Sequence, residues 1–342
     1  MQPFHYVRED SAQGAVTSQN WQSATRNEPA VAAKAQYLAG GTTLIDLMRL
    51  DVMRPTIVAD INGLSNSPLG RIDVSPQGLK LGALVRMSEA ADHPELKQTY
   101  PVIAQSLYLA ASAQIRNMAS LGGNVLQRTR CSYFRDVSYP NCNKRNPGSG
   151  CAAFDGVNRA HAILGVSDNC IASYPGDFAQ ALIALDATVD IAGPNGARTI
   201  AFAELHRAPG DTPHLEANIA PGELITGFTV AAATWTRRSM YLKIRDRESY
   251  EFALASAAVA LDMDGGTVKQ ARIALGGVAA KPWRAREAEA ALTGKSLDDA
   301  TLTDAAEAAF RGAQPREHNT FKLALGKQTL IRALRQTAAM EL

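Results

Sequence analysis

The sequence lacks the long apolar runs of a membrane protein. No stretch of its 342 residues approaches the length of a membrane span. The opening residues, MQPFHYVREDSAQGAV, have no basic start followed by an apolar run, which is the pattern of a signal peptide. We therefore expect a soluble protein without an export signal of its own.

An excess of charge of one sign is also missing. The chain has 35 Lys and Arg residues against 33 Asp and Glu, a formal net charge of +2. This near balance creates no overall field that would attract nucleic acid or a membrane surface, so we expect neither as a partner. Internal repeats and low-complexity tracts are absent as well, and the length favours two or three domains.

The motifs of side-chain catalysis are missing. The sequence contains no G-x-S-x-G elbow and no H-E-x-x-H pair, and its histidines are scattered without ligand spacing. The G-x-G-x-x-G fingerprint and the Walker loop are absent too, and nothing marks an NAD site. We expect no catalytic side chain, and any chemistry would come from bound cofactors.

Cysteine is scarce and confined to one segment. The only four are Cys131, Cys142, Cys151 and Cys170, spaced C-x10-C, C-x8-C and C-x18-C, without a compact C-x-x-C. In a chain without a signal peptide, metal ligation is the expected use of clustered cysteines. An all-thiolate set suits zinc or an iron-sulfur cluster, while buried thiols or disulfides remain alternatives. His161 lies between the last two cysteines and could replace one thiolate.

The first part of this segment, residues 128–150, is basic and rich in turn formers. It carries five Arg or Lys residues against one Asp and has no apolar period, so it is a loop, either ordered or disordered. Its cations would offset the negative charge of a 4Fe-4S cluster: Arg128, Arg130, Arg135, Lys144 and Arg145.

Two glycine pairs stand at candidate phosphate-binding turns. The first is in the segment from Tyr37 to Leu44, where a strand leads through Gly40 and Gly41 to a helix that Thr42 or Thr43 would cap. The second is in the segment 116–124. The alternatives are an ordinary tight turn for the first pair, and for the second a helix C-cap followed by a strand.

Apolar periodicity predicts a mixed fold. Strands are expected at Ala35–Leu38 and in hairpins over 64–85 and 190–205, and helices from about residue 88 to 112, where one proline divides two helices. Another helix is expected from residue 177. Beyond residue 234, three strands with a Gly-Gly turn precede helices, which indicates a separate α+β domain.

Four segments together carry a family resemblance: YLAGGTTLIDLMR, QIRNMASLGGNVLQRTRC, PGELITGF and MYLKIRDRESYEFALAS. They resemble the FAD-binding (medium) subunit of the xanthine oxidase family over essentially the whole chain. The resemblance is closest to the flavin subunit of bacterial periplasmic molybdenum aldehyde oxidoreductases, in which an inserted loop holds a 4Fe-4S cluster on four cysteines. 4-Hydroxybenzoyl-CoA reductase is similar in that respect. The four cysteines follow Gly122-Gly123-Asn124, where that insert is expected.

The resemblance implies an α+β fold. A two-part α/β FAD-binding domain (PCMH-like) would be followed by a C-terminal domain of a three-stranded sheet and a helical bundle. The expected boundaries are residues 1–60 for the first FAD-binding subdomain and 61–233 for the second, with the 4Fe-4S loop at about 127–171 inserted in it. The C-terminal domain would cover residues 234–342.

The resemblance also implies the binding residues. The FAD pyrophosphate would be held by the first loop: Gln36, Tyr37, Leu38, Ala39, Gly40, Gly41, Thr42, Thr43 and Leu44. A second wall would be formed by Ala110, Ala111, Ser120, Gly123 and Asn124. Asp177 would lie near the ribose, with Ile225 and Lys243 along the flavin ring. The alternatives are a helix N-cap for Asp177, a core residue for Ile225 and a solvated strand lysine for Lys243.

The implied function is electron transfer in a heterotrimer. A large subunit with a molybdenum cofactor would oxidise an aldehyde, a small subunit would pass electrons through 2Fe-2S clusters, and FAD here would deliver them to oxygen, a quinone or ferredoxin. The subunit alone would not oxidise aldehydes. Its location would be periplasmic by co-export with a partner, or cytoplasmic. Alternatives are the flavin subunit of a hydroxybenzoyl-CoA reductase-like or CO dehydrogenase-like complex, and a zinc-stabilised scaffold without redox function.

Overall fold

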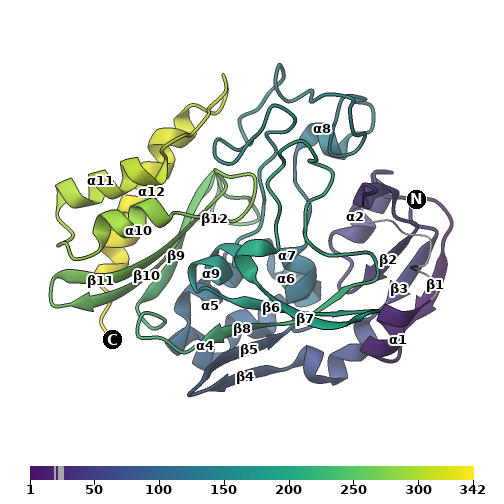
Figure 1. Cartoon of the computed structure of the whole chain (residues 1–342), viewed down its shortest axis with the longest axis horizontal. Coiled ribbons are helices and arrows are strands. Elements are labelled where there is room, and N and C mark those ends of the chain that lie inside the picture. Colours follow the sequence, from purple (N-terminus) through teal and green to yellow (C-terminus); the bar gives the residue numbers. More distant parts are fainter. Residues whose placement is uncertain (19–20, 22–26) are drawn as a thin grey trace.

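The computed structural model describes residues 1–18, 21 and 27–342, and contains three sheets that follow one another along the chain (Figure 1). The strands are β1 (His5–Arg8), β2 (Ala35–Leu38), β3 (Ile57–Asp60), β4 (Ile72–Ser75), β5 (Gly78–Gly82), β6 (Thr188–Gly193), β7 (Gly196–Ala201), β8 (Leu224–Ala231), β9 (Ser239–Ile244), β10 (Ala255–Asp264), β11 (Thr267–Gly276) and β12 (Trp283–Arg284). The helices are α1 (Ala12–Thr17), α2 (Leu44–Arg49), α3 (Met87–Asp92), α4 (Pro94–Thr99), α5 (Pro101–Tyr108), α6 (Ala113–Met118), α7 (Leu121–Val125), α8 (Ser132–Arg135), α9 (Phe178–Ala184), α10 (Arg286–Leu292), α11 (Asp299–Ala309) and α12 (Phe321–Ala338). Short 3-10 helices cover Ala30–Ala32, Asn62–Asn66, Pro68–Gly70 and Phe202–Glu204.

The first sheet is parallel, with β3 between β1 and β2. Helix α2 makes the crossover from β2 to β3, as a parallel pair requires. The strand, glycine turn and helix predicted from residue 35 onward are therefore confirmed. Buried side chains of α2, among them Leu47 and Met48, pack against Val58 of β3.

The second sheet is antiparallel, in the order β4-β5-β8-β6-β7. Its β4-β5 and β6-β7 hairpins confirm the two predicted ones, and the second turns at Gly196, whose φ of +110° suits glycine. Strand β8 arrives from much later in the chain and pairs with β5 and β6. It thereby brings Leu224 and Ile225 to the same part of the molecule as the first sheet.

The segment 87–108 contains three helices, not the predicted two. Pro94 begins α4 and Pro101 begins α5. Proline is tolerated in the first turn of a helix because its missing N–H would have no intrahelical partner there. Each proline therefore starts a new helix, and the prediction of one break is corrected to two.

The third sheet has the order β12-β11-β10-β9 and is antiparallel. The three predicted strands are present with their Gly-Gly turn, and the two-residue β12 is an addition. Ala258 and Ala260 of β10 belong to the core shared with the second sheet, whereas Val259 and Leu261 pack toward the C-terminal helices. Figure 1 shows α10, α11 and α12 covering that outer face.

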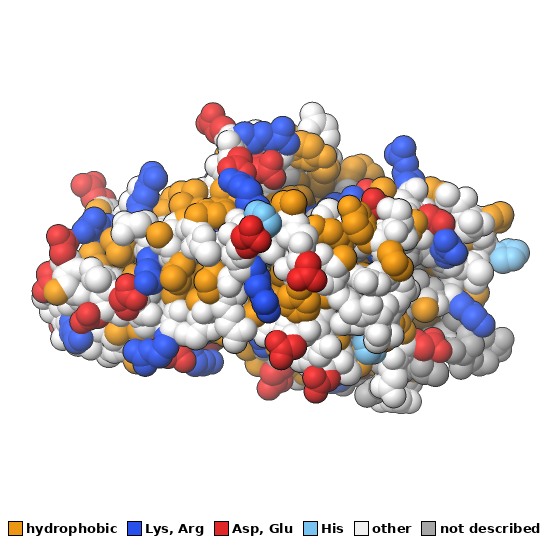
Figure 2. All heavy atoms as spheres, turned by 90° about the horizontal axis from the view of Figure 1, so that it is seen from above, with side chains coloured by type: hydrophobic (Ala, Val, Ile, Leu, Met, Phe, Trp, Pro, Cys, Tyr) orange, Lys and Arg blue, Asp and Glu red, His pale blue; other side chains and the backbone are white. Residues whose placement is uncertain are grey.

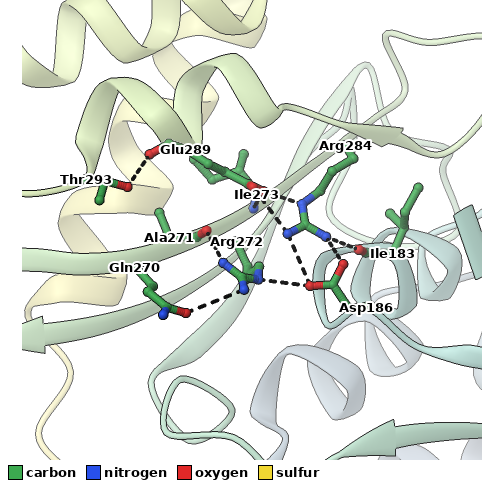
Figure 3. Close-up of polar contacts among 9 residues, drawn as sticks. All are labelled: Ile183, Asp186, Gln270, Ala271, Arg272, Ile273, Arg284, Glu289 and Thr293. Carbon is green, nitrogen blue, oxygen red and sulfur yellow. Dashed lines mark hydrogen bonds and ion pairs between the residues drawn. The ribbon is translucent and has the colours of Figure 1, made fainter.

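An arginine network joins the third sheet to α9 (Figure 3). The Arg284 guanidinium donates to the Ile183 carbonyl oxygen at 2.7 Å and to the Asp186 carboxylate at 2.7 Å. Glu289 of α10 accepts from Arg284 and, at 2.7 Å, from the backbone N–H of Ile273. Arg272 donates to the same Asp186 carboxylate at 2.9 Å. These charge-assisted bonds fix the position of the C-terminal sheet relative to α9.

The cysteine-bearing segment is a folded loop, so the ordered alternative is the correct one. It projects from the top of the molecule in Figure 1 and contains α8 as its helix. The buried Arg145 guanidinium donates to the carbonyl oxygens of Tyr133 and Phe134 at 2.8 and 2.7 Å. Phe134 is fully buried against residues of α2. Side chains thus replace regular secondary structure in holding this segment together.

Candidate cofactor-binding sites

A cavity of about 380 Å³, here named the large cavity, opens between the first sheet, α7 and the start of β8. Its size lies in the range of small-molecule and cofactor pockets. Many of the residues predicted to bind FAD line it: Gln36, Tyr37, Ala39, Gly40, Gly41, Thr42, Thr43, Leu44, Ser120, Gly123 and Ile225. The structure therefore brings both glycine loops and the β8 residue to one space.

Close backbone packing joins the two glycine loops. A side-chain carbon at Gly40 would lie 1.9 Å from the backbone oxygen of Met118, so only glycine fits there. Gly41 has a φ of +74°, which also favours glycine. The first loop is thus more than an ordinary tight turn, because its backbone is in contact with the chain that leads into the second loop.

The second glycine pair is inside a helix. Gly122 and Gly123 belong to α7, and the Ser120 hydroxyl accepts from the Gly123 N–H at 3.2 Å as its N-cap. The alternative of a helix C-cap followed by a strand is therefore wrong. In the first loop, Thr43 occupies the N-cap position of α2, but its side chain makes no capping hydrogen bond, which corrects the predicted threonine cap.

Tyr37 holds one wall of the large cavity in place. Its hydroxyl donates to the carbonyl oxygens of Ala15 and Gly222 at 3.1 and 3.0 Å, and its ring lies 4.4 Å from that of Trp21. Burial raises the pKa of the Tyr37 hydroxyl well above its ordinary value. The side chain is therefore a neutral donor that connects β2 with the segment before β8.

Several lining residues were not predicted from the sequence. Arg128 and His214 line the large cavity together with Glu216. The Arg128 side chain is only 7% exposed, and its Nε and Nη1 atoms have no hydrogen-bond partner among the described residues. The Nδ1 atom of His214 is likewise unpartnered within that part of the chain. Buried donors of this kind call for a polar ligand or water, so the lining suits an anionic or polar cofactor.

The sequence does single out Arg128 as one of the basic residues of the loop, but it predicts that this cation offsets the charge of a 4Fe-4S cluster and does not predict that it lines the large cavity. His214 and Glu216 stand in no motif. Their position in the cavity follows from the path of the chain between β7 and β8, which local patterns do not reveal.

Six predicted residues do not line the large cavity: Leu38, Ala110, Ala111, Asn124, Asp177 and Lys243. Ala111 has a φ of +47°, an unusual conformation for a residue other than glycine. The side-chain nitrogen of Asn124 contacts the Met87 sulfur at 3.3 Å, while its buried Oδ1 has no partner among the residues described.

Asp177 and Lys243 form a buried ion pair. The Lys243 Nζ lies 2.8 Å from Asp177 Oδ2 and donates to the Leu109 carbonyl oxygen at 3.1 Å. The Tyr241 hydroxyl donates to the other carboxylate oxygen at 2.7 Å. The Lys243 side chain is 1% exposed, so the alternative of a solvated lysine is wrong. Asp177 stands at the N-cap position of α9 but makes no capping hydrogen bond, so the capping role is wrong as well.

All four cysteines line one small cavity, here named the four-cysteine cavity, together with His161 and Lys144. None of the four sulfurs is in a disulfide. Cys142 and Cys151 face each other across an antiparallel bridge, and Cys170 lies in a tight turn closed by Ser167. The widely spaced cysteines thus converge because the loop folds back on itself twice.

Burial keeps three of these thiols protonated at neutral pH. It raises the pKa of the Cys131 thiol to about 12 and raises those of Cys151 and Cys170 above their ordinary value. A metal binds the thiolate, so metal binding here would release protons.

His161 is buried beside the cysteines. Its Nε2 lies 3.2 Å from the Cys131 sulfur, and its Nδ1 has no partner in the described part of the chain. Burial, with the nearby charge of Lys322, lowers the pKa of His161 to about 4, so the ring is neutral at neutral pH. A neutral ring can donate one N–H to a thiolate. Across residues 1–18, 21 and 27–342, no three His, Cys, Asp or Glu side chains are arranged to hold a single metal ion.

The outer face of the molecule carries charges of both signs. Figure 2, which views the protein from above Figure 1, shows acidic and basic side chains interspersed over the surface. None of the helices within the described residues has the length and apolar character needed to cross a membrane.

Comparison with known proteins identifies the family. Residues 9–231 match the FAD binding domain in molybdopterin dehydrogenase, and residues 240–337 match the CO dehydrogenase flavoprotein C-terminal domain. The chain is 45% identical over 311 residues to the aldehyde oxidoreductase FAD-binding subunit PaoB of Escherichia coli (strain K12), covering 89% of this chain and 92% of that one. It is 26% identical over 303 residues to the glyceraldehyde dehydrogenase medium chain of Sulfolobus acidocaldarius, covering 89% and 85%.

A solved structure has the same architecture. A chain of the carbon monoxide dehydrogenase from Hydrogenophaga pseudoflava matches with a TM-score of 0.74 and 26% identity, over 99% of this chain and 98% of that one. The expected fold, an FAD-binding domain followed by a C-terminal domain of a sheet and helices, is thereby confirmed. The chain belongs to the FAD-binding medium subunits of the molybdenum hydroxylase family and is an oxidoreductase subunit.

Proposed function

We propose that the chain is the FAD- and 4Fe-4S-containing electron-transfer subunit of a molybdenum aldehyde oxidoreductase. The observation that carries the aldehyde assignment is the 45% identity to the FAD-binding subunit of the E. coli aldehyde oxidoreductase, which spans 89% of this chain. The two cavities supply independent support, because each has the donor set that one of the two cofactors needs.

The large cavity is the proposed FAD site. The first loop would hold the pyrophosphate, because its residues from Ala39 to Leu44 line the cavity and two of them, Gly40 and Gly41, bear no side chain. The unpartnered Nε and Nη1 atoms of Arg128 would add charge-assisted hydrogen bonds. Ser120 and Gly123 would close the opposite wall. Ile225 would present an apolar surface to the flavin.

Asp177 is proposed to lie near the ribose of the FAD and Lys243 at the polar edge of the flavin, with the buried ion pair joining the two. Neither residue lines the large cavity, so this proposal rests on the family resemblance and on the pair's burial. Lys243 is held by two acceptors, the Asp177 carboxylate and the Leu109 carbonyl. A lysine fixed in this way is a preorganised positive charge.

The four cysteines are the proposed 4Fe-4S ligands. Four free thiols line one cavity, and an all-thiolate donor set suits an iron-sulfur cluster. His161 would donate its N–H to the Cys131 thiolate. When bound, FAD would supply two-electron redox chemistry and the cluster one-electron chemistry.

The partners and the location follow from the proposal. A large subunit with a molybdenum cofactor would oxidise the aldehyde, and a small subunit with 2Fe-2S clusters would deliver electrons to this chain. Oxygen, a quinone or ferredoxin would be the external acceptor. The chain would be exported to the periplasm with a partner, or would stay in the cytoplasm.

A CO dehydrogenase-like complex is the second candidate. It is favoured by the match of residues 240–337 to the CO dehydrogenase flavoprotein C-terminal domain. The difference lies in the reductant, since the flavin subunit would have the same role in both complexes.

An anaerobic reduction experiment tests the proposed function. The chain is purified with the subunits that assemble with it, and the flavin absorbance is followed after addition of an aldehyde or of carbon monoxide. Bleaching by the aldehyde, but not by carbon monoxide, is the expected result, and the isolated subunit should remain oxidised with both. A colourless preparation that contains zinc would instead support the scaffold alternative and overturn the proposal.

A further inference from the structure

A cavity of about 50 Å³, here named the middle cavity, separates the two proposed cofactor sites. Leu126 and the segment 215–217 line both this cavity and the large cavity. Lys144, Cys170 and Ala172 line both this cavity and the four-cysteine cavity. The three cavities therefore lie in a row, with Cys170 as the cysteine on the side of the middle cavity.

Three charged residues cross this row. Glu216 lines the large and middle cavities and forms ion pairs with Arg128 and with Lys144, the latter at 3.0 Å. Arg128 lines the large cavity, whereas Lys144 lines the other two. The Arg128 and Lys144 side chains are 7% and 11% exposed, so solvent screens these charges only weakly.

The three side chains are held in place on both sides. The Arg128 guanidinium lies 4.9 Å above the ring of the fully buried Phe134, and Lys144 donates to the Pro213 carbonyl oxygen at 2.9 Å. Burial raises the pKa of the Glu216 carboxyl, but the charges of Arg128 and Lys144 outweigh that effect and hold it below its ordinary value. Glu216 is therefore ionised at neutral pH.

We propose that Arg128, Glu216 and Lys144 form a charged bridge that couples the redox potential of a cluster on the four cysteines to that of a flavin in the large cavity. This inference rests on the proposed function. A charge placed between two redox groups shifts the potentials of both, and it does so more strongly where solvent screens it weakly. Glu216 and Lys144 are positioning residues, whereas Arg128 also belongs to the proposed FAD site.

Charge-changing variants give opposite expectations. Glu216→Gln removes a negative charge between the two cofactors, so both potentials should rise. The expected shift is about tenfold in the reduction equilibrium, which is about 59 mV for a one-electron couple and about 30 mV for a two-electron couple. Lys144→Gln should lower the cluster potential more than the flavin potential, and Arg128→Gln should lower the flavin potential more. This crossed pattern distinguishes a bridge from a general loosening of the loop.

The test is a redox titration of the assembled complex. Flavin absorbance and the electron paramagnetic resonance signal of the cluster are followed together, after FAD and iron have been quantified in each preparation. Glu204→Gln serves as the control, because Glu204 is an exposed acid in the same segment between β7 and β8. Its potentials should equal those of the wild type.

The outcomes separate the bridge from the proposed function. Wild-type complex without FAD, or without a cluster in this chain, would remove the proposed function itself. With both cofactors present, unchanged potentials in Glu216→Gln, or a shift of only one of them, would overturn the bridge. If Glu216→Gln does not assemble, the test uses Lys144→Gln and Arg128→Gln. The bridge predicts a larger shift of the cluster potential in the first variant and of the flavin potential in the second. The same pair of shifts in both variants would overturn the bridge.

Discussion

Backbone forms much of the large cavity, whereas side chains form the four-cysteine cavity. At the first, Gly40 is in contact with the backbone of Met118, and the glycine loops belong to or adjoin the regular elements β2, α2 and α7. At the second, a loop with α8 as its helix is held by Arg145, Phe134 and the cysteines themselves. The two regions should therefore fail in different ways when they are mutated.

The two cavities therefore depend on different features of the sequence. The glycine loops of the large cavity need residues without a side chain at fixed positions, because an added carbon atom would push the two loops apart. A side-chain site depends on named functional groups and on their protonation, so it should respond to single-atom replacements and to pH. The predictions below use this contrast.

The largest effect is expected for Gly40→Ala. The added carbon would lie 1.9 Å from the Met118 carbonyl oxygen, so the two glycine loops must separate. We expect a loss of about 3 kcal/mol in the free energy of unfolding and loss of FAD on desalting. Gly266→Ala is the matched control, since an added carbon there meets no atom within 4 Å. Equal FAD retention in both variants would contradict the proposal that the packed glycine loops hold FAD.

Cys142→Ser should spare the large cavity and damage the four-cysteine cavity. Cys142 is buried, and serine is a poor ligand for iron in a site of this kind. We expect iron and acid-labile sulfide to fall while FAD content stays at the wild-type level, as measured by chemical analysis and flavin absorbance. Unchanged iron would remove the cluster assignment, and a parallel loss of FAD would show that the two regions are not independent.

Lys322 should make stability depend on pH on the cysteine side of the molecule. It is fully buried on α12, and its Nζ donates to the Gly277 carbonyl oxygen at 2.7 Å. Burial, with the charge of Arg159, lowers its pKa from 10.5 to about 7. The unfolded chain therefore binds one proton more than the folded chain between those values.

The free energy of unfolding should consequently rise as the pH increases from 7 to 9, by up to about 1.4 kcal/mol per unit from this group. Urea titrations at several pH values measure the slope. Lys322→Met should show a slope smaller by that amount. Equal slopes in the two proteins would contradict the prediction.

The smallest effect is expected at Asp46, which connects the two regions. This residue of α2 lies 3.1 Å from Arg130 and 2.8 Å from Arg135 of the cysteine-bearing loop. Burial raises its pKa, but the two arginines outweigh that effect and lower it overall. Its contribution is therefore present at neutral pH and is lost as the pH falls through the lowered value.

Asp46→Asn should cost no more than about 1 kcal/mol at pH 7, because the carboxylate is partly exposed. Asp92→Asn, which breaks a more exposed ion pair with Lys97, is the control and should cost less. Urea unfolding of both variants measures the difference. A cost at Asp46 equal to that of the control would remove the proposed connection.

The sequence predicts local features of the fold well. The strand at 35–38 and the hairpins around residues 76 and 195 follow from short apolar periods and turn residues, which act within a few positions. The additional break at Pro94 was missed, because a proline in the first turn of a helix and one between helices have the same local pattern. The ion pairs of Glu216 with Arg128 and Lys144 join segments far apart in the chain, so no local pattern encodes them.

At the candidate sites, too, some features follow from the local sequence and others only from contacts between distant segments. The glycine loops are recognisable in the sequence because close backbone contact or a positive φ requires glycine at these positions. The four cysteines are recognisable by type, yet their spacing alone does not fix the ligand set. The burial of Lys243 and Asp177 depends on the folded core, which brings Lys243 of β9 next to Asp177 at the start of α9.

The most direct test of the central claim, that this chain carries both FAD and a 4Fe-4S cluster, is a metal and flavin analysis of two complexes. The wild-type complex is compared with one that carries Cys142→Ser and Cys151→Ser together, so that iron in partner subunits cancels. We predict that the wild type holds four more iron atoms and four more sulfides per FAD, with equal FAD in both. Equal iron and sulfide in the two complexes would contradict the account. So would a wild-type complex that differs from the variant by zinc and not by iron.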